Sequence, residues 1–148
     1  MASESRATTV WQGDLASGNG IASAASGAVP DLEVTWPARV ERTEGMTSPE
    51  ELLAASHASC YCMALAHVLG QAGNLPERIE TTATIEFVPG EGVKSSHLVV
   101  TGKVPGLDQA GFDSVTAEAH ENCPISGALR GNVEMSVQAT LEAEEGIL

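Results

Sequence analysis

The stretch TSPEELLAASHASCYCMALAHVLGQAG, residues 47–73, contains the clearest helix signal in the chain. Ser48 fits the N-cap position, Pro49 fits the first helical position, and Glu51 completes a capping box three residues after Ser48. The helix should end one residue before Gly73, the expected left-handed residue after the cap. Because the pattern is apolar nearly all round, we expect a long helix that is buried on most sides.

Short β-like segments precede this helix. TTVWQG and GIASAAS read as two strands joined by the glycine-rich turn SGNG. EVTWPARVER, from Glu33, carries Pro37 and therefore reads as an edge or irregular strand.

Strands and helices alternate in the segments after the helix. RIETTATIEFV and SHLVVTGKV read as paired strands around the turn PGEG, LDQAGFDSVTAEAHEN and PISGALR as two helices, and NVEMSVQATLEA as a closing strand. The acidic tail EAEEGIL is expected to be solvated. With neither a repeat nor a linker, the sequence predicts one α+β domain over residues 1–148.

Composition excludes several classes of function. A formal net charge of −13, with only seven Lys and Arg, disfavours nucleic acid and anionic membranes as partners. The N-terminus lacks the apolar run of a secretory signal, and no segment approaches the roughly 20 apolar residues of a membrane span. We therefore expect a cytoplasmic protein, in which an odd number of cysteines favours free or catalytic thiols.

Three cysteines allow three interpretations. Cys60 and Cys62 lie in the long helix, and Cys123 follows 63 positions after Cys60, at the boundary ENCPISGAL. In the first interpretation all three are inert, buried fillers. In the second, His57 with Cys60 and His120 with Cys123 form a tetrahedral zinc site.

The third interpretation is a thiol peroxidase in which Cys60 attacks and Cys123 resolves. Attack on a peroxide bond needs a thiolate, and the resulting sulfenic acid needs a second thiol. Arg39 and Glu50 are the candidates for a cation and for the carboxylate that orients it. Composition alone favours ordinary roles for both, a solvated strand residue and a helix-dipole carboxylate.

The motifs TSPEELLAASHASCYCMAL and ENCPISGAL together resemble the paired signature of the OsmC/Ohr family of organic hydroperoxide reductases, and they are closer to OsmC. The resemblance covers nearly the whole chain and includes WQGD, ARVE and VPGLD. It implies that Cys60 is the peroxidatic thiol and Cys123 the resolving thiol. It also implies that Arg39 and Glu50 form the activating ion pair.

The resemblance further implies an OsmC-like fold, with antiparallel sheets around long central helices in an intertwined homodimer whose active sites lie at the subunit interface. The implied substrates are alkyl or fatty-acid hydroperoxides. A small or protein dithiol would return the enzyme to its reduced form, and neither a metal nor another cofactor takes part.

Helix geometry gives three further expectations. Ten residues separate Glu50 from Cys60, about 15 Å of helix axis, so Glu50 most simply serves Cys60 from the partner subunit. Cys62 points roughly 200° away from Cys60 and is expected to be a buried bystander. His57, one turn before Cys60, lines the pocket or satisfies a buried carbonyl, and we favour the carbonyl.

Two functional alternatives stay open at this point. One is a catalytically silent protein of the OsmC fold that binds a hydrophobic ligand, and the other is a structural zinc protein.

Overall fold

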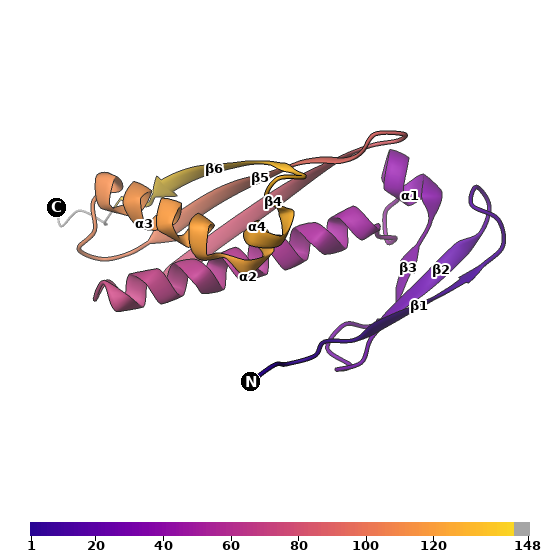
Figure 1. The fold of residues 1–148 in the computed structure, drawn as a ribbon, viewed down its shortest axis with the longest axis horizontal. Coiled ribbons are helices and arrows are strands. Elements are labelled where there is room, and N and C mark those ends of the chain that lie inside the picture. The colour runs from indigo at the N-terminus through magenta and orange to yellow at the C-terminus, as the bar shows by residue number, and fades with distance from the viewer. Residues whose placement is uncertain (144–148) are drawn as a thin grey trace. The chain divides into compact units, whose positions relative to one another are not determined.

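The computed structural model describes residues 1–143, which divide into two compact units (Figure 1). Unit 1 is Met1–Leu52, and unit 2 begins at Leu53. Residues 144–148, which include most of the predicted acidic tail, lie outside the described residues. A single domain over 1–148 stays a prediction.

Unit 1 contains a three-stranded antiparallel sheet in the order β1-β2-β3, formed by Ala7–Gln12, Asn19–Ala24 and Leu32–Val34. The first two strands are as predicted. Gly20 of β2 lies so close to Trp11 of β1 that an added Cβ would stand 2.8 Å from the indole ring.

The third predicted strand is wrong beyond β3, because the chain turns at once into helix α1, Trp36–Glu41. Thr35 is the N-cap and accepts a hydrogen bond from the N–H of Ala38 at 3.1 Å. Pro37 lies in the first turn, where its fixed φ suits a helix and its missing N–H costs nothing. Arg39 is therefore a helix residue rather than a strand residue.

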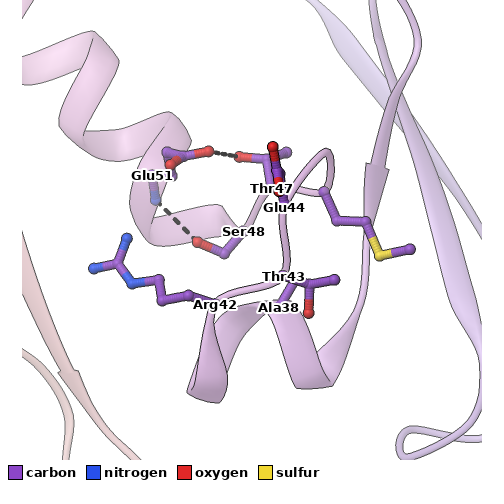
Figure 2. A pocket seen from close by; sticks show the side chains of 8 residues that line it. Ala38, Arg42, Thr43, Glu44, Thr47, Ser48 and Glu51 are labelled. Carbon is purple, nitrogen blue, oxygen red and sulfur yellow. Dashed lines mark hydrogen bonds between the residues drawn. The ribbon is translucent and has the colours of Figure 1, made fainter.

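Helix α2, Pro49–Gln71, starts as its sequence predicts. The Ser48 hydroxyl accepts the N–H of Glu51 at 3.1 Å, which is one half of a capping box. The Glu51 carboxylate accepts instead from the Thr47 hydroxyl, at 2.6 Å. Figure 2 shows these bonds beside a pocket of about 170 Å³. At the other end, Gly73 has φ +79°, as predicted for the residue after the cap.

Unit 2 holds a second sheet of β4, Arg78–Val88, β5, Gly92–Lys103, and β6, Glu134–Leu141. β4 and β5 form the predicted antiparallel hairpin. β6 pairs with β5 in parallel, which corrects the expectation of antiparallel sheets throughout. The crossover between them carries α3, Gln109–Asn122, and α4, Pro124–Leu129 (Figure 1). Such a crossover allows strands adjacent in sequence to run in the same direction.

The core of unit 2 joins α2, β5 and α3. Its fully buried side chains include Tyr61 and Leu65 of α2, Leu98 of β5 and Phe112 of α3. Gly102 of β5 provides space for the Phe112 ring, since an added Cβ would lie 2.6 Å from it.

Only one face of α2 is buried, so the prediction of burial on most sides is wrong for this chain. His57, Tyr61 and Leu65 follow one another at four-residue spacing on the buried face. Met63, on another face, is 74% exposed. Within the described residues, α2 is also long and apolar enough for a membrane span by length and composition, contrary to expectation. Its buried face packs into the core of unit 2, as in the core helix of a globular protein.

Candidate active site

Cys123 occupies the junction of α3 and α4, where it caps both helices. Its backbone N–H donates to the carbonyl of Ala119 at 2.8 Å, which closes α3. Its sulfur accepts the N–H of Ser126 at 3.5 Å, and Pro124 begins α4. The Cys123 side chain is held by these two helix ends and is only 1% exposed.

Cys60 lies on α2 and is partly exposed, and its thiol interacts with that of Cys123. Burial is the main cause of a raised pKa for Cys60. A hydrogen bond from the backbone of Ile125 opposes this pKa shift, and the Cys123 thiol adds to it. The fold thus brings together two free thiols 63 positions apart in sequence. Cys60 is the accessible member of the pair and Cys123 the buried one.

Arg39 and Glu50 form a close ion pair within unit 1. Arg39 Nη2 lies 2.6 Å from Glu50 Oε1, and Arg39 Nε lies 2.7 and 3.1 Å from the two carboxylate oxygens. Glu50 is only 7% exposed, and the Trp36 ring lies 5.8 Å from the guanidinium carbon. This two-point contact fixes the plane of the guanidinium, so its remaining donors have a defined direction. The ion pair expected from the resemblance is therefore formed.

His57 bonds with two hydroxyls rather than with the buried carbonyl that we favoured. Its Nδ1 lies 2.7 Å from Ser96 Oγ on β5, and its Nε2 lies 2.8 Å from Ser126 Oγ on α4. Burial lowers the pKa of His57, and the nearby charge of His120 lowers that pKa further. The ring is thus kept neutral at pH 7.

The two histidine–cysteine pairs do not form the ligand set required by the zinc interpretation. Within residues 1–143, no group of three or more His, Cys, Asp or Glu side chains could hold a metal ion. Both nitrogens of His57 are already bonded to serines. Burial lowers the pKa of His120, helped by Arg130 and opposed by Glu121, and its buried Nδ1 lacks a hydrogen-bond partner.

Cys62 is half-buried rather than buried, which corrects one part of its prediction. Its thiol donates to the Thr81 hydroxyl of β4 at 3.1 Å. It also lines a shallow depression of about 300 Å³ with Met63 and Ile79. Its role as a bystander stays a prediction.

Two partners of His57 were not predicted from the sequence: Ser96 and Ser126, which lie 39 and 69 residues from it. One signal was available. A histidine inside an apolar helix needs partners for both ring nitrogens, and small hydroxyl residues in otherwise buried segments are suitable partners. Ser126 lies in ENCPISGAL, beside a cysteine already under consideration.

An α+β scaffold that holds an accessible thiol against a buried one defines a class of cysteine proteins suited to thiol redox chemistry. A model of the family described as OsmC-like protein matches residues 42–138. The chain therefore belongs to the OsmC-like protein family, and the resemblance inferred from the sequence motifs is confirmed.

Individual relatives agree with this assignment. Peroxiredoxin OsmC of Escherichia coli (strain K12) is 35% identical over 131 residues, which cover 86% of this chain and 91% of that protein. Organic hydroperoxide resistance protein OhrA of Bacillus subtilis (strain 168) is 29% identical over 114 residues, 74% of this chain and 80% of that protein. The crystal structure of the organic hydroperoxide resistance protein OhrB of Bacillus subtilis is similar with a TM-score of 0.67 and 29% identity, covering 91% and 98% of the two chains.

Proposed function

We propose that this protein is a thiol-dependent peroxidase that reduces alkyl or fatty-acid hydroperoxides to alcohols. The observation that carries the proposal is the interaction between the Cys60 and Cys123 thiols, in a chain related to a protein named peroxiredoxin OsmC. Relatives named organic hydroperoxide resistance proteins support organic hydroperoxides as the substrate class.

The reaction has two steps in the oxidising direction. The Cys60 thiolate attacks the peroxide O–O bond and becomes a sulfenic acid, and the alkoxide takes a proton to leave as the alcohol. Cys123 sulfur then attacks the Cys60 sulfur, so that the S–S bond forms, the S–O bond breaks and water leaves. A small or protein dithiol reduces the disulfide by thiol exchange. No metal or other cofactor enters this cycle.

The Arg39–Glu50 pair would supply the positive charge that the first step needs. Burial raises the pKa of Cys60 within its own chain, and a guanidinium beside the sulfur would lower that pKa again. Because ten helical residues separate Glu50 from Cys60, the pair most simply acts on Cys60 of the partner subunit. Dimerisation is then part of the mechanism.

Exposed apolar side chains support an intertwined homodimer. Met63 on α2 is 74% exposed, and Val10 and Trp11 on β1 are 60% and 40% exposed. Large exposed apolar side chains on a helix and on a strand are a feature of surfaces that associate. A pocket completed by the partner would bind the alkyl tail, contributing about 0.8 kcal/mol per buried methylene. Hydrogen peroxide has no alkyl tail and gains no such binding energy there.

The net charge of −13 fits a cytoplasmic protein that binds neither nucleic acid nor an anionic membrane.

Peroxide consumption with dithiothreitol tests the proposal. The unmodified protein should consume tert-butyl hydroperoxide faster than hydrogen peroxide. Cys60→Ser should abolish consumption of both, because the attacking thiol is lost. Retained consumption in Cys60→Ser would overturn the assignment of the peroxidatic thiol.

Mixing two impaired variants tests the contribution of the partner subunit. Cys60→Ser chains keep Arg39, and Arg39→Met chains keep Cys60. Refolding them together in equal amounts should restore about a quarter of the unmodified activity, because half the dimers then hold one complete site. If the ion pair serves its own chain, the mixture shows only the average activity of the two separate variants.

One observation favours a second candidate, a silent protein of the same fold that binds a hydrophobic ligand. The raised pKa of Cys60 keeps this thiol protonated at neutral pH in the single chain. This candidate predicts no peroxide consumption and ligand binding that Cys60→Ser leaves unchanged.

A further inference from the structure

His57, Ser96 and Ser126 form a closed polar network inside unit 2. All three residues are 0% exposed. Both contacts of the His57 ring, 2.7 Å to Ser96 and 2.8 Å to Ser126, have the length of good hydrogen bonds. Each such group would cost about 1–3 kcal/mol if it were buried without a partner. The network therefore connects α2, β5 and α4 by specific hydrogen bonds, in addition to the apolar packing of the core.

The first turn of α4 connects this hydrogen-bond network with the two thiols. The N–H of Ser126 donates to the sulfur of Cys123 at 3.5 Å. The backbone of Ile125, one residue earlier, is hydrogen-bonded to the thiol of Cys60. His57 itself lies three residues before Cys60 on α2, so one rigid helix carries both. Fixing Ser126 to His57 thus fixes Cys123 relative to Cys60.

The protonation state of His57 indicates a positioning role. A neutral imidazole has one N–H donor and one acceptor, and each serine hydroxyl can serve as either partner. The neutral ring is therefore fully satisfied between Ser96 and Ser126. Neither ring nitrogen is left to accept a proton from a substrate or a thiol. Both hydrogen bonds of the ring go to serine hydroxyls and not to the sulfur of Cys60 or Cys123.

We propose, on the basis of the proposed function, that His57 is a positioning residue for the resolving step, acting through Ser126 to hold Cys123 against Cys60. In that step the S–S bond replaces the S–O bond of the sulfenic acid. The proton from Cys123 leaves with the departing hydroxide as water. When Cys123 is poorly placed, the sulfenic acid survives longer and a second peroxide oxidises it to sulfinic acid.

Ser126→Ala and Ser96→Ala are a matched pair for the test. Each substitution removes one serine hydroxyl that bonds with the His57 ring. Only Ser126 also contacts a thiol, through its backbone N–H, and the substitution keeps that N–H. Intact mass is followed over time after tert-butyl hydroperoxide is added to reduced protein. It separates the disulfide, which has lost two hydrogens, from the sulfinic acid, which has gained two oxygens.

We expect Ser126→Ala to lower the ratio of disulfide to sulfinic acid about tenfold, a change in barrier near 1.4 kcal/mol. Ser96→Ala should keep this ratio within about twofold of the unmodified protein while losing a similar amount of thermal stability. Equal ratios in both variants would reduce the network to a structural role and overturn the proposal.

A second measurement needs no peroxide. The Cys60–Cys123 disulfide is equilibrated with glutathione buffers, and its formation constant measures how well the thiols are placed. Ser126→Ala should lower this constant about tenfold, or about 30 mV, with Ser96→Ala again as the control. An unchanged constant in Ser126→Ala would overturn the positioning role. If the unmodified protein consumes no hydroperoxide, the proposed function fails, but this equilibrium still decides the positioning role.

Discussion

The two units of this chain differ in how much they bury. In unit 2, Tyr61, Leu65 and Phe112 are fully buried in one core that joins two helices and a strand. In unit 1, every residue of β1 is exposed, and Ile21 of β2 is 40% exposed. Burial of apolar surface is the main stabilising contribution to folding. Unit 2 thus gains its stability within the chain, whereas the sheet of unit 1 leaves apolar side chains exposed.

The residues of the candidate active site are also divided between the two units. Both interacting thiols, Cys60 and Cys123, belong to unit 2, and the Arg39–Glu50 pair belongs to unit 1. The proposed dimer connects the two facts, because a partner would cover the apolar surface of unit 1 and complete the site around Cys60.

The largest expected effect comes from the core of unit 2. Leu65→Ala should lower the free energy of unfolding by about 2–5 kcal/mol, because it leaves a cavity at a fully buried position. Ile21→Ala is the matched change in unit 1. It should cost much less at low protein concentration, where a dimer has dissociated. Urea unfolding at two protein concentrations measures both. An equal loss from Ile21→Ala at every concentration would contradict the comparison.

The next effect concerns association. Met63→Glu places a charge on the exposed apolar face of α2 and should weaken the dimer by about 2 kcal/mol, roughly 30-fold. Leu75→Glu is the control, because Leu75 is equally exposed, at 75%, but follows the end of α2. Sedimentation equilibrium gives both dissociation constants. If both variants dimerise like the unmodified protein, this face of α2 is not the interface.

A smaller effect tests the link between the ion pair and the thiol. Removing a cation destabilises the nearby thiolate, so Arg39→Met should raise the pKa of Cys60. The pH of half-maximal alkylation of Cys60 by iodoacetamide should then move upward by about one unit, equivalent to about 1.4 kcal/mol. Peptide mapping reports this cysteine separately from Cys62. Arg42→Met serves as the control, and an unmoved profile in Arg39→Met would separate the ion pair from the chemistry.

The smallest effect is expected at Cys62. Its thiol donates one hydrogen bond to Thr81, so Cys62→Ser should change the free energy of unfolding by less than about 1.5 kcal/mol. Turnover of tert-butyl hydroperoxide should be unchanged, because Cys62 points away from Cys60. Lost turnover in a correctly folded Cys62→Ser protein would mean that the resolving thiol has been misassigned.

Local signals in the sequence predicted most elements of the fold. Three features were predicted correctly because each depends only on neighbouring residues. They are the Ser48 cap, the glycine that ends α2 and the alternating pattern of β4. α1 is not predicted although Thr35 and Pro37 form an ordinary helix start, because a proline that follows strand-like residues also fits an irregular edge strand.

Long-range partners could not be predicted in the same way. The parallel pairing of β6 with β5 depends on how the crossover packs, and the partners of His57 come from 39 and 69 residues away. The apolar pattern of α2 correctly indicated a helix that packs into a core. It did not indicate that only one face of the helix is buried in this chain.

We propose that Cys60 and Cys123 form a catalytic pair. The most direct test adds one equivalent of tert-butyl hydroperoxide to fully reduced protein, followed by intact-mass analysis and peptide mapping, with hydrogen peroxide in parallel. We predict rapid loss of two hydrogens and a Cys60–Cys123 linkage, with a faster reaction for the alkyl substrate. Unreacted thiols in both samples, or a disulfide that involves Cys62, would contradict it.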